Sequence, residues 1–250
     1  MRKRLTLTLA LGAMVALAVA GVAHAYKPVV VKAGNLVLTF NGGITPTKLP
    51  KGKMAPITLN VSGGIATADG SHPPALKEFV IETDKNGGIN AKGLPTCKAG
   101  KIEATTTTSA EKACKSAIVG KGTTDVEVLF PESAPIQIKS KLLAFNGGVS
   151  GGKTTLFIHA YLSNPIAAAI VTTVKVSKIH NGRYGLKSVA AIPKIAGGSG
   201  SVTNFNLTIN KKGYLTAKCP DGHLDAQGEA VFTDGTRAKG AVTRPCTPTG

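Results

Sequence analysis

The feature that constrains the fold of this chain most is a series of short segments in which apolar and polar side chains alternate. Alternation with a period of two places the apolar side chains on one face of a β-strand. Asn181-Gly182, Lys212-Gly213 and Asp234-Gly235 separate such segments and supply the positive φ angles of tight hairpins. The predicted strands are 35–40, 56–61, 76–83, 126–130, 142–145, 154–162, 170–179, 184–192, 202–209, 214–219, 228–233 and 236–243. Together with 30 Gly and 14 Pro, they predict an all-β fold with an antiparallel, β-sandwich-like architecture.

One segment, residues 109–119, has helical rather than strand periodicity. Thr108 and Glu111 form a capping box before it, and Gly120 stands where a C′ glycine is expected. Its apolar side chains share one helical face: Ala110, Ala113, Cys114, Ala117 and Ile118. We therefore expect one short α-helix.

The segment 131–135, which begins and ends with proline, is the predicted boundary between two β-rich halves. The N-terminal half spans residues 26–134 and includes the helix, and the C-terminal half spans residues 135–250. Phe40-Asn41-Gly42-Gly43-Ile44 recurs as Phe145-Asn146-Gly147-Gly148-Val149, and the Asn-Gly-Gly of each copy predicts a tight hairpin. A duplicated unit and two hairpins with the same turn both explain this repeat, and five positions leave both explanations open.

Residues 1–25 have the three parts of a cleavable secretory leader. A basic tip at residues 2–4 precedes an uncharged apolar run over residues 5–22, and Ala23-His24-Ala25 predicts cleavage before Tyr26. A retained membrane anchor is the alternative, but two glycines interrupt the run and no basic flank follows it. We expect an exported chain, extracellular or at the cell envelope, with no transmembrane segment in its mature part.

Four cysteines in an exported chain predict two disulfides. Of the three possible pairings, we favour Cys97–Cys114 and Cys219–Cys246, because each joins near neighbours within one local unit. A zinc site built from the four thiolates is the competing interpretation, and it lacks the C-x-x-C pair that such sites use.

The charge of the chain comes mostly from lysine. Without residues 1–25, 27 basic and 13 acidic residues remain, a net charge of +14, and only Arg183, Arg237 and Arg244 are arginines. Scattered lysines attract polyanions through a long-range field. Nucleic-acid readers add arginine forks and aromatic platforms, whereas this chain has no Trp, four Tyr and seven Phe. Anionic cell-envelope polymers are therefore better candidate partners than a specific nucleic acid.

Two motifs resemble catalytic or binding signatures. Gly147 to Thr154 matches the spacing of a phosphate-binding loop, but a β-branched strand follows it where a helix is required, so we interpret it as a glycine-rich hairpin. His159 lies between Phe157 and Tyr161 on one strand face and is predicted to be a half-buried histidine bonded to the backbone. No histidine has a second one two to four residues away, so we predict neither a metal site nor a cofactor.

Asp221, Asp225 and Glu229 form the densest acidic group. Asp225 and Glu229 would stand about 13 Å apart along one strand, too far apart to flank one glycosidic bond. We therefore expect a solvated strand face, and we assign no catalytic residue.

Three segments carry a resemblance: Gly93-Leu94-Pro95-Thr96-Cys97-Lys98, Phe130-Pro131-Glu132 and Pro193-Lys194-Ile195-Ala196-Gly197-Gly198. In these segments the chain resembles a group of uncharacterised secreted actinobacterial proteins with no assigned activity. The resemblance implies export and a bacterial source, and it supplies no catalytic residue.

The sequence predicts a non-enzymatic structural or binding protein with a cationic surface, secreted or associated with the cell envelope. Two alternatives stay open. One is an extracellular hydrolase whose carboxylates meet only in the folded chain, and the other is a carbohydrate-binding module that would present Tyr161, Tyr184 or Tyr214 on an exposed platform.

Overall fold

The computed structural model describes residues 26–250, so the predicted leader and its cleavage site lie outside the described residues. Residues 26–250 are all-β with one short α-helix, as the sequence predicts, and every pairing in the large sheet is antiparallel. The strands are β1 (Val29–Ala33), β2 (Leu36–Thr45), β3 (Lys48–Pro50), β4 (Ala55–Thr67), β5 (Leu76–Asp84), β6 (Gly87–Ile89), β7 (Ile118–Val128), β8 (Ile136–Ser150), β9 (Lys153–Leu162), β10 (Ala168–Asn181), β11 (Tyr184–Ala191), β12 (Gly200–Ile209), β13 (Leu215–Ala217), β14 (His223–Phe232), β15 (Arg237–Pro245) and β16 (Thr247–Thr249).

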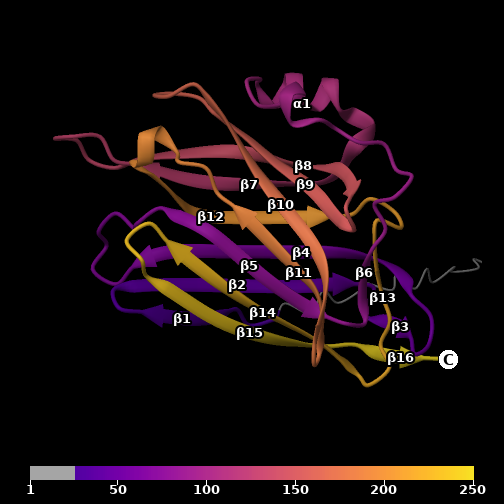
Figure 1. Cartoon of the computed structure of the whole chain (residues 1–250). Helices are drawn as coiled ribbons and strands as arrows, with labels where there is room; N and C mark the ends of the chain where they lie inside the picture. The colour runs from indigo at the N-terminus through magenta and orange to yellow at the C-terminus, as the bar shows by residue number, and fades with distance from the viewer. Residues whose placement is uncertain (1–25) are drawn as a thin grey trace, which may run out of the picture.

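One large sheet makes up most of the molecule, in the order β1-β2-β4-β12-β7-β8-β9-β10-β11-β5-β14-β15. The first and last strands of this order, β1 and β15, lie side by side, so the sheet curls until it is nearly closed into a barrel (Figure 1). Gly240 of β15 packs there so close to β1 that a Cβ atom would lie 3.0 Å from the Val31 side chain. The two layers expected of a β-sandwich are therefore parts of one curled sheet.

Strands from both predicted halves alternate in this sheet. β12 lies between β4 and β7, and β5 lies between β11 and β14. The segment 131–135 joins β7 to β8, which are neighbours in the sheet. The two halves thus contribute to one continuous structure.

The helix is shorter than the sequence predicts. α1 spans Thr107–Ala113, and its N-cap is Thr106, whose side chain accepts a hydrogen bond from the Ser109 backbone N–H, rather than Thr108. A 3-10 turn over Lys115–Ala117 follows, with others at Ala99–Lys101 and Ala196–Gly198. Gly120 lies inside β7, where Ile118 already pairs with β8, so the C′ assignment is wrong. β-pairing outcompetes helix propagation at this end.

The predicted tight turns at the Asn-Gly-Gly repeats are also wrong. Asn41 to Gly43 continue within β2 and pair with residues 60–62 of β4, and Asn146 lies within β8. Each asparagine donates a side-chain hydrogen bond to a backbone carbonyl: Asn41 to Tyr26 at 3.1 Å, and Asn146 to Pro95 at 3.1 Å. The glycine-rich turn after the second copy, at Gly151 and Gly152 between β8 and β9, is the predicted hairpin.

Packing inside the curled sheet is dense at one end. Val126, Val128, Ile138 and Leu162 form one buried cluster, and Leu36, Ile65 and Phe232 contribute to another. On the outside, α1 and its flanking turns cover β8 and β9 around the Cys97–Cys114 disulfide (Figure 1). A separate two-stranded parallel pair, β3 and β16, packs near the second disulfide.

Candidate functional site

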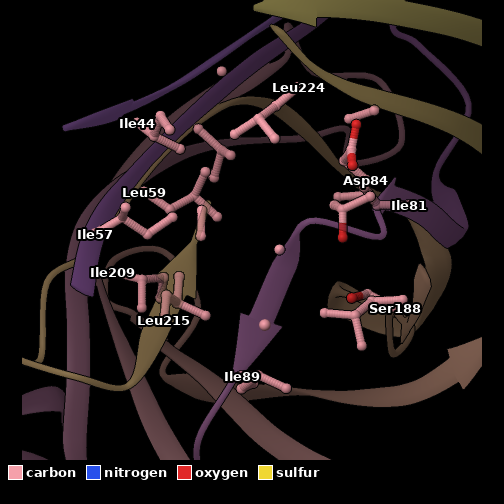
Figure 2. A pocket seen from close by; sticks show the side chains of 18 of the residues that line it. Ile44, Ile57, Leu59, Ile81, Asp84, Ile89, Ser188, Ile209, Leu215 and Leu224 are labelled. Atoms are coloured by element: carbon pink, nitrogen blue, oxygen red, sulfur yellow. The ribbon is translucent and has the colours of Figure 1, made fainter. Parts of the chain in front are cut away.

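The interior of the curled sheet contains a cavity of about 240 Å³. It is lined by side chains from strands on several sides, and on β4, β5, β10, β11 and β15 lining residues two apart point inward (Figure 2). Ile57 and Leu59 of β4 face it, as do Ile81 and Thr83 of β5. The cavity is thus a consequence of period-two alternation in a sheet that closes on itself.

The lining is predominantly apolar. Its aliphatic and aromatic members are Phe40, Ile44, Ile57, Leu59, Val61, Ile81, Ile89, Leu156, Val174, Val176, Leu186, Ile209, Tyr214, Leu215, Ala217, Leu224, Ala226 and Val242. Apolar walls with a small number of polar groups are typical of sites for small molecules. The volume also exceeds that of a 150 Å³ apolar cavity that binds benzene in another protein.

One side of the cavity is bordered by two short strands. β13 pairs with the start of β4, and β6 pairs with β13 (Figure 2). Gly88 in β6 permits this close approach, because a Cβ atom there would lie 2.8 Å from Met54 and 2.9 Å from the Thr216 hydroxyl. A side chain at position 88 would force the Met54 and Thr216 side chains to move.

Tyr214 places an unpaired polar atom in this apolar surrounding. Its side chain is fully buried and lines the cavity, and its hydroxyl has no hydrogen-bond partner among residues 26–250. Burial raises the pKa of the Tyr214 hydroxyl above its ordinary value, so the group stays protonated and can both donate and accept a hydrogen bond. Buried tyrosine hydroxyls usually find a partner, which makes this one an exception.

Arg183 gathers three carboxylates at the rim of the cavity. Its Nε lies 2.7 Å from Asp84 and 3.1 Å from Asp225, and its Nη1 and Nη2 contact Asp221. Hydrogen bonding to Asp221 and to Asp84 raises the pKa of Arg183, and the same contact lowers the pKa of Asp221. This clamp joins the ends of β5, β11 and β14.

Arg244 lines another part of the cavity and joins the two ends of the sheet. It donates hydrogen bonds to the Gly42 carbonyl and, at 2.9 Å, to the Asn41 side chain. Its guanidinium carbon lies 4.8 Å from the centre of the Tyr26 ring, a cation–π contact. Burial lowers the pKa of Arg244, and all of these partners are uncharged.

A serine, a histidine and a glutamate meet outside the cavity in a way that resembles a hydrolytic triad. His72 Nδ1 lies 2.6 Å from Glu127, and its Nε2 lies 3.2 Å from the Ser201 hydroxyl. The Ser201 hydroxyl, however, donates to the Pro73 carbonyl at 2.6 Å, and its residue is only 1% exposed. A nucleophile must direct its proton to the base and be open to substrate, so this group fastens a loop to the sheet instead.

His159 lies in β9 and is buried. Its Nε2 lies 3.1 Å from the Thr105 carbonyl, and burial lowers the pKa of the imidazole below its ordinary value. The predicted backbone-bonded histidine is confirmed, although it is fully rather than half buried.

Both predicted disulfides, Cys97–Cys114 and Cys219–Cys246, are present. The acidic group divides: Asp221 and Asp225 join the Arg183 clamp, and Glu229 pairs with Arg237 at 3.0 Å.

Sequence reasoning missed two residues, Asp84 and Tyr214, whose roles depend on strands that are distant along the chain. Tyr214 was named as a candidate for an exposed platform, and its burial excludes it from one. No local pattern marks either residue as part of a cavity.

No family model matches the sequence, and no match was found among curated proteins or solved structures. Within residues 26–250, no helix has the length and apolar character needed to cross a bilayer. The geometry of the chain itself therefore carries the functional argument.

Proposed function

We propose that this chain is an exported, non-enzymatic binding protein that holds a small apolar molecule inside its curled sheet. The main support for this proposal is the 240 Å³ cavity with its aliphatic walls. Export rests on the predicted leader, and the two disulfides support it, because disulfides persist in oxidising compartments.

The size of the cavity sets the size of the ligand. Scaled from the 150 Å³ cavity that binds benzene, 240 Å³ accommodates about ten non-hydrogen atoms. At about 0.55 kcal/mol per atom, a ligand of this size would bind with about 5.5 kcal/mol, a dissociation constant near 0.1 mM. Longer natural ligands that extend past the rim would bind more tightly.

The contacts that the polar groups make favour a binding role over hydrolysis. Asp84 and Asp225 meet at one end of the cavity, but both carboxylates contact the Arg183 guanidinium. A catalytic carboxylate must instead reach the substrate or a water molecule, and this ion pair occupies both carboxylates. Ser201 is likewise committed to a backbone carbonyl.

The test is calorimetric titration of the mature chain with propylbenzene. We expect saturable binding that Ala226→Phe abolishes, because Ala226 lines the cavity and the added phenyl ring takes the space of six of the roughly ten atoms that fit, too much to leave room for propylbenzene. Ala66→Phe is the matched control, since Ala66 lies exposed on β4. Absence of saturable binding, or equal binding by both variants, would contradict the proposal.

Attachment to anionic cell-envelope polymers is a second candidate, favoured by the net charge of +14 after residue 25. It is compatible with an interior ligand site. Retention on isolated cell walls at low salt, with release as salt rises, would support it, and no retention at low salt would exclude it.

A further inference from the structure

Arg244 is the one cationic side chain in the cavity lining, and it pairs with no carboxylate in the part of the chain that the structure describes. Arg183 and Arg237, the other two arginines of residues 26–250, each contact a carboxylate at 3.0 Å or less. A guanidinium stays charged when it is buried. Burial lowers the pKa of Arg244, which reflects the hydration that its charged form loses. Arg244 is therefore a positive charge that no carboxylate among the described residues compensates.

The donors of Arg244 are only partly used. Its Nε donates to the Gly42 carbonyl, its Nη2 donates to the Asn41 side chain at 2.9 Å, and its Nη1 reaches the Thr243 carbonyl at 3.5 Å. A guanidinium carries five N–H groups, so two remain without an acceptor within residues 26–250, one on each terminal nitrogen. A carboxylate accepts from such a pair of N–H groups through its two oxygens, the bidentate contact that arginine forms best.

Strand alternation directs Arg244 toward the interior of the sheet. Val242 and Arg244 are two apart on β15 and both line the cavity, whereas Thr243 between them is exposed. Leu224, the residue opposite Arg244 in the β14–β15 register, is another lining residue. The guanidinium thus shares a face of the sheet with the aliphatic wall.

Arg244 also lies where the wall of the cavity has an unpaired strand edge. β1 pairs with β2 only as far as Phe40, so residues 41–45 of β2 pair with β4 alone. Arg244 reaches from β15 to Asn41 and Gly42 on this edge, and it is partly exposed. A ligand whose apolar part is inside the cavity could therefore place a charged group at Arg244 without burying that charge completely.

The carboxylates near the cavity have partners of their own. Asp225 is opposite Thr243 in the register and accepts a hydrogen bond from the Thr243 hydroxyl at 2.6 Å, so its carboxylate is on the face of the sheet opposite to Arg244. Asp84 contacts the Arg183 Nε at 2.7 Å. Neither carboxylate occupies the free donors of Arg244.

We propose that the ligand is an amphipathic carboxylate of about ten non-hydrogen atoms, with its apolar body inside the cavity and its carboxylate bonded to the Arg244 guanidinium. This inference rests on the proposed binding function. It assigns Arg244 as the residue that selects the charged group of the ligand, and the aliphatic wall as the part that binds its apolar body.

The experiment compares three linear probes of similar length by calorimetry at neutral pH: octanoate, its neutral amide octanamide and the cation octylammonium. Each is titrated into the mature wild-type chain, into Arg244→Gln and into Arg237→Gln. We expect the wild type to bind octanoate about tenfold more tightly than octanamide, the value of a charge-assisted hydrogen bond at a partly exposed site. Octylammonium should bind most weakly. In Arg244→Gln, the preference for octanoate over octanamide should disappear.

Arg237→Gln is the matched control. It removes the same charge from the same strand, but Arg237 is exposed and lies outside the cavity lining, so the preference should stay at the wild-type value. Arg244→Lys is a second test, because Arg244 also joins β15 to β2 and Arg244→Gln could fail to fold. Lysine keeps the charge without the planar fork, so the preference should fall only in part.

Equal wild-type affinities for octanoate and octanamide would overturn the inference, while saturable octanamide binding kept the proposed function intact. A preference that persists undiminished in the Arg244 variants, or that falls equally in Arg237→Gln, would overturn it as well. Failure of all three probes and of propylbenzene to bind the wild type would overturn the proposed function, and the inference with it.

Discussion

Replacement of Tyr214 by phenylalanine should stabilise the ligand-free protein. Most tyrosine-to-phenylalanine changes in a protein core remove a hydrogen bond and lower stability. Here the hydroxyl is fully buried and has no partner among the described residues, so the folded state loses its hydration without compensation. An unsatisfied buried hydroxyl costs about 1–3 kcal/mol.

The size of the expected gain in stability depends on the packing contacts that Tyr214→Phe preserves. The ring packs in the cluster that includes Val176 and Ile209, and phenylalanine retains these contacts. We expect the free energy of unfolding to rise by about 1 kcal/mol, the lower end of that penalty. For a chain of this size, that gain raises the thermal midpoint by about 2–4 °C.

Urea unfolding with both disulfides intact measures the effect. A shift of the midpoint at constant slope reports a change in stability rather than in the compactness of the denatured state. Tyr161→Phe is the control: Tyr161 is partly exposed, and the change should stay within about 0.5 kcal/mol. If Tyr214→Phe lowered stability by 1 kcal/mol or more, the hydroxyl would have a partner in solution, and the argument that it is unsatisfied would fail.

Three further predictions concern the rest of the framework. Replacement of Cys219 and Cys246 by alanine should lower the free energy of unfolding by about 3–4 kcal/mol, because the unfolded chain regains the entropy of a loop with a sequence separation of 27. Urea unfolding measures this loss, and a loss below 1 kcal/mol would contradict the prediction. Burial lowers the pKa of His159 below 6.5 in the folded chain, so on acidification the unfolded chain binds a proton before the folded chain does. The free energy of unfolding therefore falls as the pH drops from 6.5 toward the pKa of His159 in the folded chain. His159→Gln should flatten this part of the stability profile, and an unchanged slope would refute the assignment. Ser201→Ala should cost about 1–2 kcal/mol, and phenylmethylsulfonyl fluoride should leave the wild-type mass unchanged; a covalent adduct at Ser201 would show a reactive nucleophile.

The sequence predicted the parts of this fold that depend on local pattern. Alternation identified the strands, Asp234-Gly235 marked a real hairpin with Gly235 at a φ of 89°, and near neighbours identified the disulfides. These features depend on a few adjacent residues, and elementary backbone preferences decide them.

The order of the strands could not be predicted in the same way. Alternation shows which side chains share a face of a strand, but it does not show which strand lies beside it. The placement of β12 between β4 and β7, and of β5 between β11 and β14, joins segments far apart in the sequence. The cavity exists only because of these pairings, so its lining residues could not be predicted from the sequence alone.

Local signals also failed where tertiary pairing overrode them. Gly42 and Gly43 favour a turn, yet β4 offers a complete partner strand, and pairing through residues 58–67 satisfies the backbone of β2. Ile118 has helical spacing, but it begins β7 because β8 is available to pair with it.

A crystal structure of the mature chain soaked in propylbenzene tests the central claim most directly. We predict electron density for one molecule inside the curled sheet, in contact with Leu59, Ile209 and Leu215. Density only on the outer surface, or side chains that fill the interior completely, would contradict the claim that this protein holds an apolar ligand within its sheet.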